Sequence, residues 1–149
     1  MKVEQLVEAI ARLDAKDALP CRLTAADWRA LAPYLSVRFL REGDPLMEEG
    51  DSERELFILG EGELVVSIGD NEIARLQPGT VVGEGTFFSG APRSATVTPS
   101  MPGTAWGLHW DRFDAMSKKH PMLAVNLIKG LAGVLAVRMR EALLVGHFA

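Results

Sequence analysis

Short apolar segments recur between residues 36 and 108, and glycine, proline, aspartate and asparagine separate them. Strands of this length, spaced at intervals of roughly ten residues, are typical of a β-sandwich or a β-barrel. Eight such segments are present, at residues 36–41, 46–47, 56–59, 63–68, 73–76, 80–82, 94–98 and 104–108. We therefore expect an eight-stranded, jelly-roll-like β-barrel over residues 36–110.

Helical patterns flank this segment on both sides, so the predicted fold class is mainly β with flanking helices. Apolar residues recur at helical spacing over residues 3–13, and Thr24 followed by Asp27 is typical of a helix N-terminus. Pro121 suits the first turn of a long helix that we expect to end near Val145. Three parts result: N-terminal helices at 1–35, the barrel at 36–110 and C-terminal helices at 111–149.

The long C-terminal helix is apolar on nearly every side. Between Pro121 and Val137 only Asn126 and Lys129 are strongly polar. A helix of this composition is covered on several sides, and one small barrel covers only some of them. We therefore expect a homodimer or another partner protein to pack on this helix; packing against the N-terminal helices alone is the alternative.

Charge is distributed unevenly along the chain. The chain carries a net charge of −4, but residues 41–110 hold four basic and twelve acidic side chains, for −8. This segment would repel a nucleic-acid backbone, so we expect no nucleic-acid partner. A helix-turn-helix after the long helix would need roughly 60 further residues, and only four follow Val145.

The sequence also predicts no membrane span and a cytoplasmic location. The longest uninterrupted apolar run, 131–137, has seven residues, and the N-terminus lacks the apolar region of a signal peptide. Cys21 is the only cysteine, which excludes an internal disulfide and a cysteine-based zinc site.

No catalytic or metal-binding set stands out, so we expect neither an enzyme nor a metal site. The three histidines, at 109, 120 and 147, all lie outside the segment 36–108. Asp111 is predicted to cap a helix. The acidic residues near the start of the barrel lie at turns or strand ends and are predicted to form a solvated face: Asp44, Glu48, Glu49, Asp51, Glu53 and Glu55.

The segment 83–97 carries the most chemical information. A strand ends at Gly83, and a short helical turn can follow, whose free amides suit an anion. Arg93 supplies a planar fork of donors that matches a phosphate, and Glu84 supplies an acceptor for sugar hydroxyls. Two interpretations stay open: a clamp for a sugar phosphate, or a Glu84–Arg93 salt bridge that only holds the loop.

These residues resemble the phosphate-binding cassette of the cyclic nucleotide-binding domain family. That family includes bacterial catabolite-activator-type regulators, regulatory subunits of cAMP-dependent kinase, and cyclic nucleotide-gated channels. Gly83-Glu84, Arg93 and Ala95 match the cassette, with the nine-residue step from Glu to Arg of its kinase-type members. The resemblance covers about residues 36–145 and includes the structural glycines Gly43, Gly50, Gly62 and Gly79.

The resemblance implies a role for each site residue. Glu84 would accept the ribose 2′-hydroxyl, Arg93 would pair with the cyclic phosphate, and Ser94 would add a phosphate contact or touch a guanine. Gly83 would let the backbone approach the sugar. The family commonly places a lid helix over the base, which makes Arg138 a candidate for stacking on a purine.

Gly85 departs from the family pattern, because an apolar residue usually stands there. We expect this glycine to leave a gap in the core and to loosen the short helix by roughly 1 kcal/mol relative to alanine. The resemblance as a whole implies a stand-alone sensor that binds a cyclic nucleotide, cAMP by default or cGMP, without a further cofactor. It would signal through hinge and lid helices at 111–149. The alternative is a degenerate domain that acts as a ligand-free interaction or dimerisation module.

Overall fold

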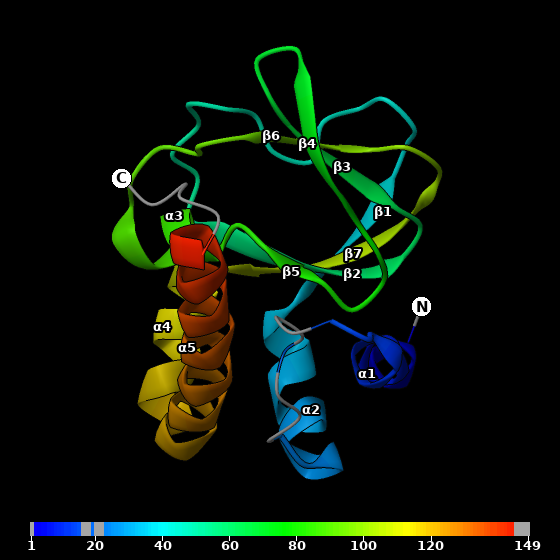
Figure 1. Cartoon of the computed structure of the whole chain (residues 1–149). Helices are drawn as coiled ribbons and strands as arrows, with labels where there is room; N and C mark the ends of the chain where they lie inside the picture. Colours follow the sequence, from blue (N-terminus) through cyan, green and yellow to red (C-terminus); the bar gives the residue numbers. More distant parts are fainter. Residues whose placement is uncertain (1, 16–18, 20–22, 145–149) are drawn as a thin grey trace.

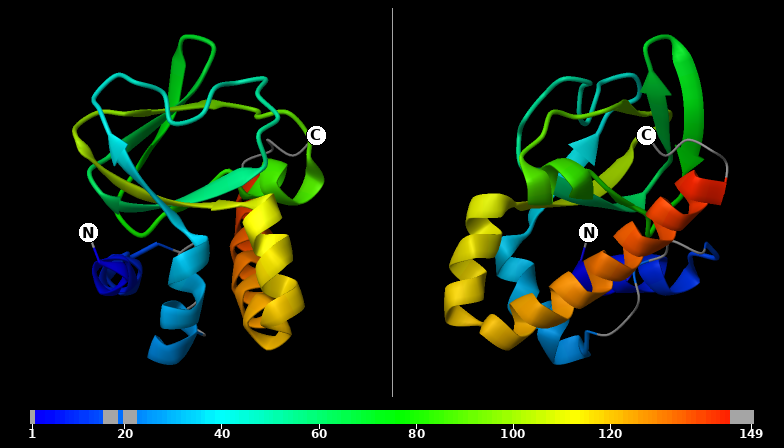
Figure 2. Two further views of the ribbon diagram at one scale, coloured as in Figure 1. Left: turned by 180° about the vertical axis from the view of Figure 1, so that it is seen from behind. Right: turned by 60° about the vertical axis from the view of Figure 1, so that its left-hand side comes forward.

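The computed structural model describes residues 2–15, 19 and 23–144. Cys21, His147 and the expected helix end at Val145 lie outside the described residues. Two antiparallel sheets face each other at one end of the molecule, and the long helices gather beneath one of them (Figures 1 and 2).

The strands form a four-stranded and a three-stranded sheet. The larger sheet has the order β1 (Ser36–Leu40), β7 (Gly103–His109), β2 (Glu55–Glu61) and β5 (Val81–Val82). The smaller sheet has the order β4 (Asn71–Leu76), β3 (Leu64–Ile68) and β6 (Thr96–Pro99). Gly69 and Asp70 form the tip of the β3–β4 hairpin, where Ile68 pairs with Asn71.

The expected eight-stranded barrel is only partly present. The predicted strand at 46–47 is a single bridge, Met47 to Val97, between turns at Gly43 and Gly50 that both have positive φ. Two glycine turns so close together leave no length for a strand, because each ends the extended backbone. Among the described residues seven strands remain, in two separate sheets, so the barrel is not closed.

Most helices flank the strand segment in sequence, and α3 lies within it, between β5 and β6. They are α1 (Val3–Arg12), α2 (Ala25–Leu31), the 3₁₀ turn η1 (Ala32–Tyr34), α3 (Glu84–Ser89), α4 (Trp110–Lys119) and α5 (Pro121–Leu144). The capping box predicted for α2 is present, since Thr24 and Asp27 exchange hydrogen bonds of 2.9 and 3.1 Å. The upper part of α5 rises to the level of α3 and β5 (Figures 1 and 2).

The four-stranded sheet separates two apolar cores. Because side chains alternate along a strand, Leu56 and Ile58 of β2 face the helices, whereas Phe57 and Leu59 face the space between the sheets. This explains why β2 is apolar without interruption: both of its faces are covered. The helix-side core also holds Phe87 of α3, so the short helix is anchored at its centre.

The expectation of no membrane-spanning helix rested on the longest uninterrupted apolar run. Among the described residues, α5 is long and apolar enough to cross a membrane by length and composition alone, although a third of its most apolar stretch is buried within the chain. One such helix is weak grounds for a membrane location, because core helices have the same composition.

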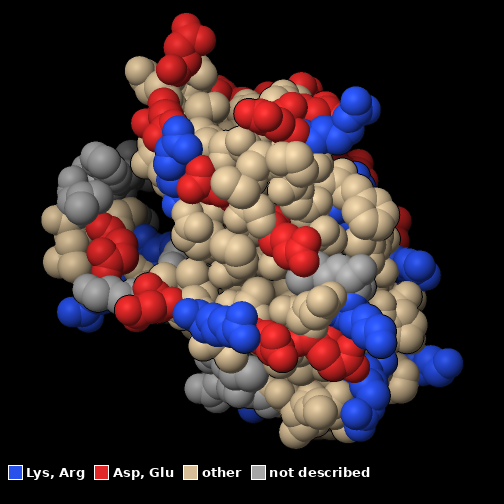
Figure 3. Space-filling view, turned by 90° about the vertical axis from the view of Figure 1, so that its right-hand side faces the viewer, with Lys and Arg blue, Asp and Glu red and all other residues tan. Residues whose placement is uncertain are grey.

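The surface carries mixed charge. On the face in Figure 3, acidic and basic side chains are interspersed, and no continuous basic surface is present there.

Candidate functional site

A cavity of roughly 390 Å³ lies between the two sheets, α3 and α5. Its walls come from segments far apart in sequence: Met47, Val66 and Val97 from the strand region, and the chain from Val81 to Thr86. The structure brings all six predicted site residues to this one cavity: Gly83, Glu84, Gly85, Arg93, Ser94 and Arg138. Its volume lies in the range of small-molecule sites.

Gly83 stands where no other residue fits. Its φ is +82°, and a Cβ there would lie 2.6 Å from Nη1 of Arg93 and 3.0 Å from the carbonyl oxygen of Glu55. The absence of a side chain lets the Arg93 guanidinium lie against the backbone, where Nη1 donates to the Gly83 carbonyl at 2.9 Å. Gly83 therefore makes room for Arg93 as well as for the turn into α3.

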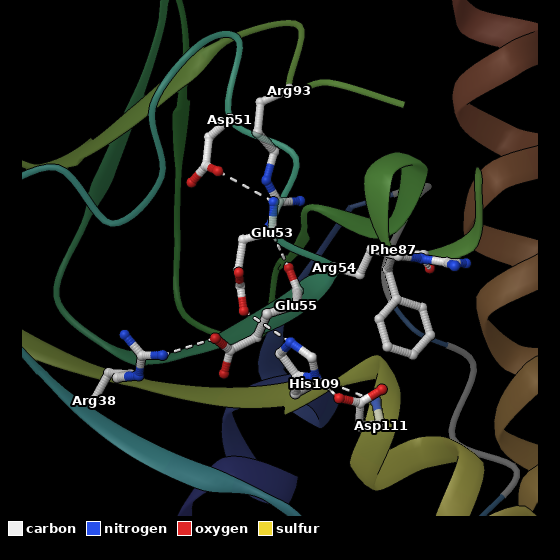
Figure 4. Close-up of polar contacts among 9 residues, drawn as sticks. All are labelled: Arg38, Asp51, Glu53, Arg54, Glu55, Phe87, Arg93, His109 and Asp111. Carbon is white, nitrogen blue, oxygen red and sulfur yellow. Dashed lines mark hydrogen bonds and ion pairs between the residues drawn. The ribbon is translucent and has the colours of Figure 1, made fainter. Parts of the chain in front are cut away.

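Arg93 is buried, with 5% of its surface exposed. Its Nη2 donates to the Glu55 carbonyl at 2.5 Å, and its Nε has no partner among the described residues. Burial lowers the pKa of Arg93, and the surrounding carboxylates oppose this shift, Asp51 first and then Glu55. Figure 4 shows Asp51 and Arg93 pointing toward one another. The site thus holds a desolvated cation whose bonds go to neutral carbonyls.

Glu84 is paired with the long helix. Nη1 of Arg138 donates to Oε1 of Glu84 at 2.5 Å, and Nη2 donates to the Val81 carbonyl at 2.6 Å. Both side chains are largely buried, with 12% of Glu84 and 26% of Arg138 exposed. The alternative predicted for this loop, a Glu84–Arg93 pair, is therefore not the contact that Glu84 makes: its partner comes from α5.

Gly85 and Ser94 both line the cavity and are exposed. The expected gap in the core at Gly85 is wrong, since a Cβ there would meet no atom within 4 Å. A larger side chain at this position would point into open space rather than into the core.

Two details near the cavity correct the sequence analysis. Glu55, predicted to be solvated, is only 4% exposed; Nη2 of Arg38 donates to its Oε1 at 2.7 Å (Figure 4). Burial raises the pKa of Glu55, and Arg38 opposes that shift. The cap of α4 is the His109 ring, whose Nδ1 accepts from the Asp111 amide, and not the Asp111 side chain.

The burial of Glu55 has no clear signal in sequence, because its position before an apolar strand fits an exposed end equally well. Sequence reasoning also missed Arg54, which contacts α3 and Trp110. Within the described part of the chain, no group of three or more His, Cys, Asp or Glu side chains is placed to hold a metal ion.

The sequence profile of the cyclic nucleotide-binding domain matches residues 37–120. The chain belongs to this family. The match includes the cavity-lining residues between Val81 and Val97.

Known members resemble this chain over much of its length. It is 29% identical over 119 residues to the cGMP-dependent protein kinase of Plasmodium berghei, covering 78% of this chain and 14% of the kinase. A cyclic nucleotide-binding domain from Methylobacillus flagellatus superposes with a TM-score of 0.80 at 23% identity, covering 94% of this chain and 79% of that one. The Thermus thermophilus catabolite activator protein superposes with a TM-score of 0.72 at 27% identity, covering 85% and 60%.

The chain spans about a seventh of the P. berghei kinase. It therefore corresponds to a regulatory module within that relative. These comparisons identify the family and its cyclic nucleotide ligand, in agreement with the sequence-based resemblance.

Proposed function

We propose that this chain is a non-catalytic, cytoplasmic sensor in which the cavity binds a purine cyclic nucleotide and α5 carries the signal. One observation supports this above the others: Arg138 of α5 is bonded to Glu84 inside the cavity. A ligand that engages Glu84 would therefore share or displace a contact of the output helix.

The phosphate is proposed to bind at Arg93. Each Nη nitrogen carries two hydrogens, and each uses one on a backbone carbonyl. Nε is buried, and no described residue accepts from it. An anion beside this guanidinium would offset its burial, which already lowers its pKa. The buried cation thus favours an anionic ligand, even though the surrounding segment is acidic.

The ribose is proposed to bind at Glu84. Oε1 of Glu84 holds Arg138, so a 2′-hydroxyl either shares the carboxylate with Arg138 or displaces it. A displaced Arg138 would stack on the purine, since it already lines the cavity. The position of α5 over the base then depends on whether ligand is bound. A sensor requires such a difference between its ligand-bound and ligand-free states.

The base is proposed to be adenine by default, with guanine as the other candidate. Ser94 is exposed at the cavity and offers a hydroxyl to guanine. Because the P. berghei relative is a cGMP-dependent kinase, both nucleotides belong in one experiment. Purified protein is titrated calorimetrically with cAMP, cGMP, a cyclic dinucleotide and 5′-AMP. Saturable binding of cAMP or cGMP that 5′-AMP does not reproduce is expected; no binding of either would support the ligand-free module instead.

The output is proposed to pass through a homodimer formed by α5. One face of α5 packs on its own domain, through Leu123, Ala124, Leu127, Leu131 and Val134. The opposite face is exposed and follows the alternating three- and four-residue spacing of a coiled coil: Met122, Val125, Lys129, Ala132, Ala136, Met139 and Leu143. The two small residues at its centre allow two helices to approach closely.

Sedimentation equilibrium at micromolar concentrations tests this dimer. The doubly substituted Val125→Glu/Ala132→Glu is expected to be monomeric, because carboxylates in the seam oppose each other. Lys119→Glu, on the exposed side of α4, is the matched control and is expected to leave the association unchanged. A wild-type chain that stays monomeric at high micromolar concentration would contradict the proposal.

A further inference from the structure

Arg54 contacts three elements: β2, α3 and α4. It precedes β2 directly, and its backbone carbonyl accepts from the Trp110 amide at 2.8 Å. Its side chain donates from Nε to the Phe87 carbonyl at 3.0 Å and from Nη2 to the Phe88 carbonyl at 2.8 Å. Figure 4 shows the guanidinium extended beside α3 at Phe87. The same group lies over the Trp110 ring, 4.1 Å from its centre.

Each of these contacts has a physical reason. The last carbonyls of a helix have no partner within the helix, and a cation near them also favours the helix dipole. In α3 the Thr86 carbonyl is bonded by the Gly90 amide, and Arg54 takes the next two. A planar guanidinium can donate in its plane and stack on an aromatic ring with its face. One side chain therefore holds the end of α3 and the start of α4 together.

The two helices have different neighbours at their other ends. The first residue of α3 is Glu84, which lines the cavity and holds Arg138. The first residue of α4 is Trp110, and α4 leads through His120 directly into α5. The Phe87 ring also contacts Trp110 and Phe113 of α4, at centre-to-centre distances of 5.2 and 5.6 Å. Because of these contacts, α4 either resists a movement of α3 or moves with it.

We propose that Arg54 is a positioning residue that couples the ligand cavity to the C-terminal helices by tying the C-terminus of α3 to Trp110. This inference rests on the proposed function, because it requires a ligand that moves α3. Apolar ring contacts alone allow the helices to slide, whereas two hydrogen bonds and a stacked cation fix their mutual position. Coupling, and not only stability, depends on the guanidinium.

The test compares ligand response in Arg54→Met, Arg54→Lys and wild type. Hydrogen exchange is measured on peptides from 84–90 and from 110–120, with and without saturating cAMP or cGMP, because Arg138 on α5 contacts the cavity directly and α4 does not. Calorimetry on the same samples establishes saturation. Methionine keeps the stem and removes the donors and the charge; lysine keeps a cation but not the fork. Arg75→Met is the matched control, since the Arg75 side chain makes three hydrogen bonds, to Glu72 on β4 and to Glu63 just before β3, and contacts neither α3 nor Trp110.

In wild type and Arg75→Met, ligand is expected to change exchange in both segments. In Arg54→Met the response at 84–90 persists, and the factor by which ligand changes exchange at 110–120 falls by about fivefold or more, the lower range of typical allosteric coupling. Arg54→Lys restores part of it. A ligand response at 110–120 as large as wild type in Arg54→Met overturns the inference, even if that variant unfolds at a lower temperature.

The two failures are distinguishable. Wild-type protein that binds neither nucleotide refutes the proposed function, and the coupling falls with it. Wild-type protein that binds but shows no change at 110–120 refutes the coupling alone. If Arg54→Met does not fold, Arg54→Lys decides: a reduced response at 110–120 supports the role, and an undiminished response overturns it.

Discussion

Replacing Arg93 by alanine is the most direct test of the cavity, because this residue is the buried cation at its centre. The substitution removes the donors proposed for the phosphate. Hydrogen bonds to charged groups contribute roughly 1.5–3 kcal/mol each. Losing one such interaction weakens binding about tenfold to hundredfold. Arg93→Lys is expected to recover only part, because an ammonium keeps the charge without the planar fork.

A thermal-shift assay converts this loss into a temperature. At a ligand concentration of 100 times the wild-type Kd, binding stabilises the folded state by about 2.7 kcal/mol. At the same concentration, a hundredfold weaker variant gains only about 0.4 kcal/mol. With roughly 2–4 °C per kcal/mol for a chain of this size, the wild-type midpoint rises by about 5–11 °C and that of Arg93→Ala by about 1–2 °C.

The ligand-free midpoint must be measured separately for each variant. Arg93→Ala leaves the carbonyls of Gly83 and Glu55 without their donors, which destabilises the fold, but it also removes a desolvated cation. Only the shift on adding ligand reports binding. Arg75→Ala removes an exposed guanidinium outside the cavity and serves as the control. An equal ligand-induced shift in Arg93→Ala and wild type would refute Arg93 as the phosphate partner.

Four further substitutions have defined expectations. Glu84→Ala should weaken nucleotide binding by less than Arg93→Ala in calorimetry, because it removes an acceptor from a neutral hydroxyl; a larger loss would contradict this. Gly85→Ala should raise the melting midpoint, because alanine stabilises a helix by up to about 1 kcal/mol relative to glycine and a Cβ at this position meets no atom within 4 Å. A lower midpoint in calorimetric scans would contradict this. Burial raises the pKa of Glu55 from its usual 4.5 in the folded protein. Its contribution to the free energy of unfolding is therefore complete below pH 4.5 and is lost as the pH rises through the pKa of the folded state. Hydrogen bonds from Ser100, Gln77 and Arg75 lower the pKa of Glu63 in the folded protein. Its contribution to the free energy of unfolding is therefore present above pH 4.5 and is lost as the pH falls through the pKa of the folded state. Urea unfolding is measured against pH for wild type, Glu55→Gln and Glu63→Gln. Each substitution should remove its own residue's part of the pH dependence of stability, and the two parts should have opposite sign; parts of the same sign would contradict the assignment.

The site was predictable because its chemistry lies in one short segment. Gly83, Glu84, Arg93 and Ser94 are close in sequence, and the structure brings them to one cavity. Arg138 is 45 residues beyond Arg93 in the numbering, and only the family resemblance pointed to it. The pattern of alternating short apolar segments also predicted every strand that forms, with ends that differ by a few residues.

The failures share a cause: they depend on contacts between segments. The segment 46–47 has strand-like residues, but the turns on either side and its single bridge to Val97 decide its structure. Glu55 precedes an apolar strand in either environment, and its burial follows from the approach of Arg38 on β1. Arg54 is one basic residue among many in sequence; its role follows from the proximity of the α3 carbonyls and Trp110.

The short helix α3 is held at both ends by arginines from other parts of the chain. Arg138 of α5 reaches its first residue, Glu84, and Arg54 reaches its last carbonyls and Trp110. The two contacts differ in exposure to ligand, because Glu84 lines the cavity and the Arg54 contacts do not. A cyclic nucleotide at Glu84 would thus compete with the first arginine while the second keeps α3 attached to α4. Under the proposed function, ligand replaces the Arg138–Glu84 contact, and the Arg54 contacts transmit the resulting movement of α3 to α4.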